Sequence, residues 1–273
     1  TFELDETSIA TARHLATMDD AKQHVITPLT VRDGPTFAQA ISFPGPLDAA
    51  IFLSWGFQQR LDRFIDAFET FRADHPSHAG SVAWISMMCT DQHAASEVHN
   101  EVWAREFRRL IHDIKHTVVV FSPWNDAAVL KRVWCLWEFY NTLKSGGTFT
   151  VQLPRIEEAN MARSLSCAEL SVGGLLRGIT TAAAAGRTPE LEWMIKEWVE
   201  DGMGFDAVDE RVQAALTSAM VVPSHAGAMV AAKRSTLRAI VLTQEQGSLV
   251  RRIFFDDASG RWRRGRWHVE AGA

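Results

Sequence analysis

The chain has 273 residues, of which 47% are apolar and 22% charged, and its formal net charge is −5. These values are typical of a water-soluble globular protein and exclude extensive disorder. The weak negative charge also means that the chain as a whole does not attract nucleic acid. The length fits one large domain, or one domain with an extension.

The cysteines and the apolar runs indicate the cellular compartment of the protein. Cys89, Cys135 and Cys167 are odd in number and widely spaced, which favours free thiols in a reducing environment. No apolar run reaches the ~18 residues of a membrane span, and no signal segment opens the chain. We therefore expect a cytoplasmic protein without a transmembrane segment. The first residue is Thr1, which leaves room for further sequence upstream.

In chain order, residues 1–48 are expected to form an entry segment, with a helix over 8–24 followed by four prolines. Residues 49–155 then alternate between two patterns. Short apolar runs typical of buried strands occupy 50–54, 82–88, 117–122 and 148–153. Helical periodicity fills the segments between them, 57–73, 97–114 and 126–143. This alternation predicts an α/β fold with a central parallel sheet.

Residues 156–273 are predicted to be a mainly helical extension. The helical pattern is firm over 190–200 and 206–219, and weaker over 229–242. Residues 157–168 and 180–186 fit either helix or connector. The segment 253–262 predicts a terminal hairpin that turns at 258–260.

Polar side chains follow three of the predicted strands. In a parallel sheet the ligand site lies beyond the carboxyl ends of the strands, because the loops converge there. Tryptophans stand beside these polar groups, so the loops suit a ligand with a ring and sugar hydroxyls. Capping of helices and solvated turns are the alternative roles for the same residues. The candidates are Ser54, Trp55 and Gly56, then Asp91, Gln92 and His93, then Ser122, Trp124, Asn125 and Asp126.

Glu138 is the candidate for chemistry. It lies within a predicted helix among almost entirely apolar neighbours, in the segment 134–140. A carboxylate in such surroundings is costly unless it is paired or placed at a cleft, and partial desolvation would raise its pKa. The alternative is a surface glutamate on a wet strip of the helix, paired with Lys131, Arg132 or Lys144.

Two further patterns suggest binding. His112 and His116 have the i, i+4 spacing of metal ligands, but the acidic partner of the zinc-protease pattern is missing, so we expect no metal. The run Arg261–Trp267 mixes arginine with tryptophan, a combination that binds phosphate backbones or anionic surfaces, or else is a soluble hairpin rim. The sequence patterns of Rossmann cofactor sites, P-loops and serine hydrolases are absent.

The order of these segments resembles a family of TIR-like domains, of a type found in algae, protists and bacteria. The resemblance covers about residues 24–155. It rests on four segments in order: Phe52-Leu53-Ser54-Trp55-Gly56, then Trp84-Ile85-Ser86 with Asp91-Gln92-His93, then Val118-Val119-Val120-Phe121-Ser122-Pro123-Trp124, then Leu130-Lys131-Arg132-Val133-Trp134-Cys135-Leu136-Trp137-Glu138-Phe139-Tyr140. The resemblance implies a flavodoxin-like, three-layer sandwich that associates through its surfaces.

It also implies an activity. Many TIR domains cleave NAD at the nicotinamide glycosidic bond with one glutamate of the third helix, which by position is Glu138. No cofactor is then required, and NAD is the substrate. The candidate residues for binding it are Ser54, Trp55, Gly56, Gln92, Ser122, Trp124 and Trp134.

One departure from the family pattern supports a second hypothesis. Family members commonly carry a histidine and one further residue between the serine and the tryptophan, whereas Ser54 is followed directly by Trp55. A shorter loop, together with the C-terminal extension, favours a non-catalytic TIR-like scaffold that acts in self-association or a larger protein assembly.

Overall fold

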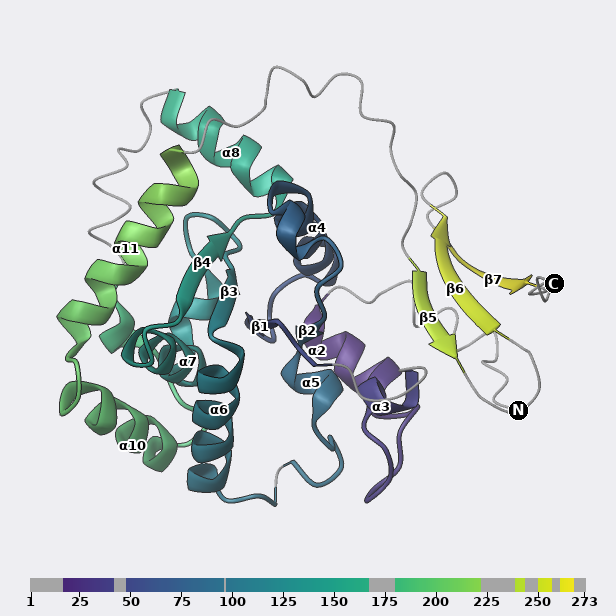
Figure 1. Cartoon of the computed structure of the whole chain (residues 1–273), viewed down its shortest axis with the longest axis horizontal. Coiled ribbons are helices and arrows are strands. Elements are labelled where there is room, and N and C mark those ends of the chain that lie inside the picture. The colour runs from purple at the N-terminus through teal and green to yellow at the C-terminus, as the bar shows by residue number, and fades with distance from the viewer. Residues whose placement is uncertain are drawn as a thin grey trace.

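The computed structural model of the chain describes residues 17–41, 48–95, 97–166 and 180–221, and three strands between residues 239 and 267. Its centre is a four-stranded parallel sheet of order β2-β1-β3-β4 (Figure 1). The strands are β1 (Ile51–Ser54), β2 (Ala83–Trp84), β3 (His116–Val120) and β4 (Thr148–Gln152). This order matches the flavodoxin-like arrangement, so the predicted α/β class is confirmed.

Helices cover both faces of the sheet. Val119 and Val151 face one apolar cluster, which also holds buried residues of α6, α7, α10 and α11. Val118 and Val120 face the other cluster, with α2 and α4. Neighbouring residues of β3 therefore enter different cores, which explains why its residues 118–120 are all valine. These helices are α2 (Met18–Ala21), α4 (Leu61–Asp74), α6 (Asn100–Ile114), α7 (Val133–Lys144), α10 (Pro189–Glu200) and α11 (Phe205–Val221).

The second predicted strand, over 82–88, is mostly wrong. Only Ala83–Trp84 is a strand, and a short helix, α5 (Ser86–Cys89), follows at once. Met87 of this helix is buried in the core beside α4. A short apolar run serves a buried strand and a buried helical turn equally well, so periodicity did not separate them.

Three predicted helices begin later than expected because the residue before each is extended. Before α6 this residue is His99, at φ −60° and ψ 140°, so the helix starts at Asn100 and not at 97. Arg60 has φ −64° and ψ 133°, so α4 starts at Leu61 and not at 57. Arg132 has φ −114° and ψ 124°, so α7 starts at Val133. The residues before it form a 3₁₀ turn, η3 (Ala128–Lys131). The helix α7 is largely buried, as its almost entirely apolar sequence indicates.

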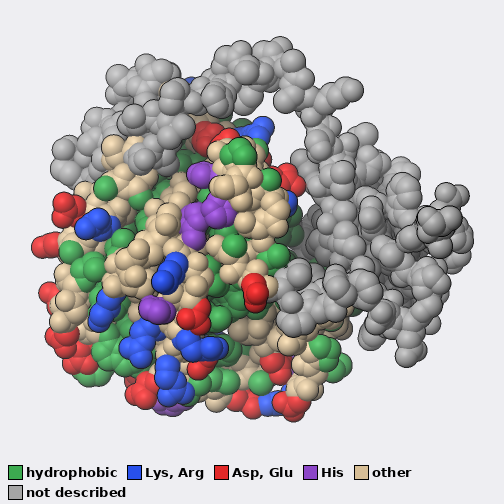
Figure 2. Space-filling view, in the orientation of Figure 1, with side chains coloured by type: hydrophobic (Ala, Val, Ile, Leu, Met, Phe, Trp, Pro, Cys, Tyr) green, Lys and Arg blue, Asp and Glu red, His purple; other side chains and the backbone are tan. Residues whose placement is uncertain are grey.

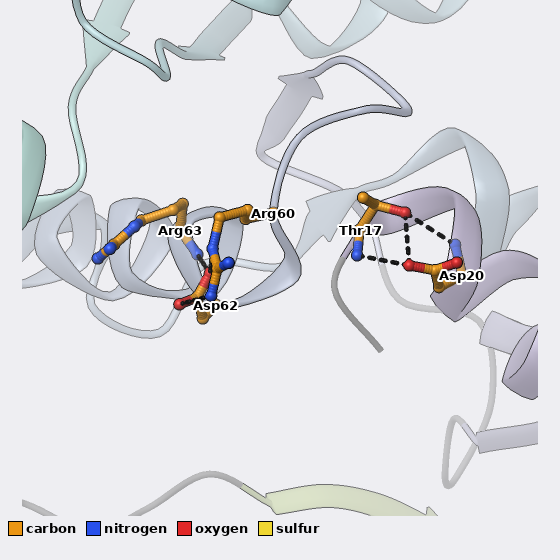
Figure 3. A network of polar contacts seen from close by, with 5 residues as sticks. All are labelled: Thr17, Asp20, Arg60, Asp62 and Arg63. Carbon is orange, nitrogen blue, oxygen red and sulfur yellow. Dashed lines mark hydrogen bonds and ion pairs between the residues drawn. The ribbon is translucent and has the colours of Figure 1, made fainter. Parts of the chain in front are cut away.

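The N-terminal segment begins with a capped helix (Figure 3). The Thr17 hydroxyl accepts from the Asp20 amide at 3.1 Å, and the Asp20 carboxylate accepts from the Thr17 amide at 2.9 Å. This reciprocal pair is a capping box. Figure 3 also shows the neighbouring ion pair of Arg60 with Asp62. Of the helix predicted over 8–24, residues 8–16 lie outside the described residues. A π-helical turn, η1 (Lys22–Ile26), and the unpredicted α3 (Phe37–Ile41) follow α2.

The segment after β4 does not stand apart from the core. Leu191, Val199 and Val212 of α10 and α11 are buried in the same cluster as Val119. The two firm helical predictions are confirmed, and of 157–168 the described residues 157–166 are helical, in α8 (Arg155–Ser166). The Ala-rich stretch holds one 3₁₀ turn, η4 (Thr181–Ala183). Gly204, at φ 80°, turns the chain from α10 into α11.

The last described strands form an antiparallel sheet, β5-β6-β7. They are β5 (Ala239–Thr243), β6 (Val250–Asp256) and β7 (Arg261–Trp267). Phe255 pairs with Trp262, so the predicted hairpin is confirmed, although its turn lies outside the described residues. The helix predicted over 229–242 is wrong at 239–242, which is strand. In the part of the chain that the structure describes, no helix is long and apolar enough to cross a membrane.

Candidate functional site

The topology of the sheet selects one edge for ligand binding. From β1 the chain continues to β2 on one side, and it then returns to β3 on the other side of β1. The carboxyl ends of β1 and β3 therefore flank the point where the strand order reverses, which is where flavodoxin-like folds bind ligands. Ser54 ends β1, and Ser122 and Trp124 follow β3, so these predicted candidates lie at this edge.

The edge brings together Ser54 and Glu138, which are 84 residues apart in sequence. The Ser54 hydroxyl donates to Glu138 Oε2 over 2.5 Å, and the Glu138 side chain comes from the middle of α7. Glu138 is only 6% exposed, so the alternative of a solvated surface glutamate is wrong. Lys131 pairs instead with Asp126, and Lys144 donates to the Tyr140 hydroxyl.

Burial controls the proton on Glu138. The loss of hydration raises the pKa of this carboxyl to about 7, although the Ser54 hydrogen bond and the positive charge of Arg132 lower it in part. Near neutral pH the carboxyl is therefore divided between its protonated and ionised forms. Such a group can stabilise positive charge or exchange a proton in the pH range of the cell, which is typical of functional carboxyls.

Arg132 and Cys135 hold the backbone next to Ser54. The Trp55 carbonyl accepts from Arg132 Nη1 at 2.8 Å and from the Cys135 thiol at 3.3 Å. The Arg132 guanidinium also lies 4.4 Å from the centre of the Phe57 ring. Burial, with the nearby Glu138, raises the pKa of Cys135 to about 12. Its thiol stays protonated, so Cys135 is a structural donor and not a nucleophile.

The tryptophans of the site belong to the core. Trp55 is 3% exposed and packs edge-on against Phe57 and Phe64. Trp124 is 5% exposed, and its amide donates to Glu157 Oε2 at 3.0 Å. Neither ring lies on the surface, so the predicted stacking on a ligand requires the loops to move. Trp134 is partly buried against Phe107.

The remaining predicted residues have backbone or turn roles. Ser122 is 5% exposed and precedes a cis peptide bond to Pro123. Gly56 lies so close to Ala128 that an added Cβ would be 2.9 Å from the Ala128 methyl. The loops after β1 and β3 therefore touch each other. The Gln92 amide donates to Thr90, and no bond joins it to Ser54 or Glu138 among the described residues.

Sequence reasoning missed three residues near this edge. Arg132 and Glu157 hold Trp55 and Trp124 as described above. Gln59, in the loop after β1, is 3% exposed, and neither atom of its side-chain amide has a hydrogen-bond partner. For Arg132 the sequence gave one usable signal, a basic residue two positions before the Trp134–Glu138 segment. Nothing in the sequence around Gln59 marks its amide as buried.

Metal binding gains no support. His116 lies in β3 and not on a helix with His112, because Lys115, at φ 59°, ends α6 between them. Throughout the described ranges no group of three or more His, Cys, Asp or Glu residues is arranged to hold a metal ion. Comparison with known proteins adds no assignment: no protein-family model, no curated protein and no solved structure matches the chain.

Proposed function

We propose that this protein is a TIR-like NAD glycohydrolase in which Glu138 acts on the ribose next to nicotinamide. The observation that carries the proposal is the buried Ser54–Glu138 pair at the carboxyl end of β1. A buried carboxyl with one side-chain hydrogen bond destabilises a fold, and such costs are tolerated mainly where a group has a function. The resemblance of the surrounding segments to TIR-like domains supplies the reaction class.

The chemistry suits one carboxylate. Cleavage breaks the bond between the ribose C1′ and the nicotinamide nitrogen, and the bond electrons leave with nicotinamide as a neutral molecule. The ribose is left with oxocarbenium character, which ionised Glu138 stabilises while it accepts from a ribose hydroxyl. Water then adds to C1′, and a proton is released to solvent. Ser54, which lowers the Glu138 pKa, keeps more of the carboxyl ionised.

Access to the pair requires a conformational step. Glu138 is 6% exposed, and the loops after β1 and β3 meet at Gly56 and Ala128. NAD binding therefore includes separation of these two loops, which also frees the rings of Trp55 and Trp124. Opening of loops around a substrate is common and frequently limits turnover.

Nicotinamide release from NAD tests this proposal. Glu138→Gln keeps an acceptor for Ser54 but never ionises, so its rate should fall at least ~100-fold, the typical contribution of a positioned acid or base. Glu158→Gln, which replaces a half-buried glutamate of α8, is the matched control and should retain the wild-type rate. Ser54→Ala should move the pH–rate profile to higher pH. Equal release by wild type and Glu138→Gln, or none from either at high protein concentration, would refute the proposal.

A non-catalytic TIR-like assembly module is the second candidate. The observation that favours it is an exposed apolar side chain, Trp193, which is 65% exposed on α10. Exposed aromatic groups of this size are common where proteins associate. Measured masses that stay monomeric over a wide concentration range, without partners, would count against it.

A further inference from the structure

The outer face of α10 carries a groove at the protein surface. Leu191, Ile195 and Val199 are buried on the inner face of this helix. Trp193 lies on the outer face, beside a surface hollow of about 630 Å³ that is lined also by Thr188, Pro189 and Phe205. Helix capping by Thr188 does not need the indole, and Trp193 packs in neither core cluster.

The rim of this groove is acidic. Glu197 and Asp201 follow Trp193 at successive steps of four residues, so they lie along the same side of the helix. Both are exposed, and within the described residues neither has an ion-pair partner. The one cation of the lining, Lys196, is paired with Glu192 at 2.8 Å. Acidic side chains gather over α10 at the lower left of Figure 2.

An arginine is the side chain that fits both features. Its planar guanidinium stacks on an indole ring and donates paired hydrogen bonds to carboxylates, whereas a lysine does only the second well. Arginine and tryptophan are also enriched at the centres of protein interfaces. The chemistry of the groove therefore favours a peptide segment that is rich in arginine and has no acidic residue.

The chain itself contains such a segment. Residues 261–267 read Arg-Trp-Arg-Arg-Gly-Arg-Trp and form β7, the edge strand of the small sheet. An edge strand has no neighbour on one side, so it is available for contact. In Figure 1 the small sheet and α10 lie on opposite sides of the molecule, so a chain's own β7 does not face its α10.

We infer that the acidic groove around Trp193 binds the strand Arg261–Trp267 of a second copy of this chain. Groove and strand are different surfaces, so the contact is head-to-tail: each copy uses its groove for one neighbour and its strand for another. Contacts of this kind build rings or filaments, not only dimers. The inference is independent of Glu138 and of NAD, and it holds whether or not the protein is an enzyme.

Sedimentation velocity of the full chain over a concentration series tests the inference. Trp193→Ala should raise the dissociation constant by about tenfold or more, the scale on which central interface tryptophans act. Added salt should weaken the association, because the paired charges are partly exposed. A control for the charge reversals described next replaces two acidic residues away from α10, Asp48→Arg with Asp74→Arg. It makes the same change of net charge as a double reversal in the groove and should associate as wild type does.

Charge reversal makes the test specific to the two surfaces. A groove variant, Glu197→Arg with Asp201→Arg, and a strand variant, Arg263→Glu with Arg266→Glu, should each lose association. An equimolar mixture of the two should recover it, because each variant then meets an opposite charge. Circular dichroism checks that both variants fold. A monomeric wild type, a mixture that stays monomeric, or an association that disappears on nuclease treatment would overturn the inference.

Discussion

Glu138→Gln should make folding stability less dependent on pH. The pKa of Glu138 is about 7 in the folded protein against an ordinary value of 4.5, so the folded state holds this proton more tightly than the unfolded chain does. The contribution of Glu138 to stability is therefore largest below pH 4.5 and is lost as pH rises through about 7. The two pKa values differ by about 2.5, and each pKa unit corresponds to about 1.4 kcal/mol, so the complete loss is roughly 3 to 4 kcal/mol.

Urea unfolding of both proteins between about pH 4 and pH 8 measures this quantity. Other titrating groups act equally in the two proteins, so the difference between their unfolding free energies isolates Glu138. We expect the wild type to lose about 3 kcal/mol relative to Glu138→Gln across this range. Parallel pH profiles would show that the carboxyl is hydrated in the folded protein, and the reasoning from burial would be refuted.

Two other substitutions follow from buried polar groups. Burial, with His78 and His75 close by, lowers the pKa of His116 to about 4, so stability should fall as pH drops from 6.5 toward 4. His116→Gln should remove this loss, which partial solvent screening reduces to roughly 1 kcal/mol. The control is His112→Gln, which replaces an exposed histidine. If His116→Gln loses as much unfolding free energy between pH 6.5 and 4 as the wild type does, the prediction is wrong. Gln59→Met should raise the unfolding free energy by about 1–2 kcal/mol, because it removes unpartnered amide atoms. A lower urea midpoint for Gln59→Met would mean that its amide is satisfied.

The histidine prediction involves a local cluster. The His78 and His116 rings lie 4.9 Å apart, and Phe71 contacts both of them and His75. His78 belongs to a 3₁₀ turn, η2 (Pro76–His78), and histidine side chains gather in one patch in Figure 2. Burial of the His116 ring, and then its closeness to His78 and His75, lowers the pKa of His116 and makes the fold sensitive to acid.

The sequence predicted the sheet and the position of Glu138 well, for identifiable reasons. Strand β1 and the second half of β3 are apolar and buried on both faces, and the rule for carboxyl ends places Ser54 at the site. The contacts themselves depend on loop geometry. Three contacts follow from how loops 55–60 and 121–132 pack: the bond between Ser54 and Glu138, the burial of Trp55 and Trp124, and the unpartnered side-chain amide of Gln59. Periodicity carries no information about such packing.

Helix α2 is attached to the loop after β1 by two backbone hydrogen bonds. The Met18 amide donates to the Gln59 carbonyl at 2.8 Å, and the Asp19 amide donates to the Phe57 carbonyl at 3.1 Å. The loop next to Ser54 therefore cannot separate from its surroundings without breaking these bonds or carrying α2 with it. Where opening breaks the two bonds, hydrogen exchange at the Met18 and Asp19 amides reports it, although both amides lie far from Glu138 in sequence.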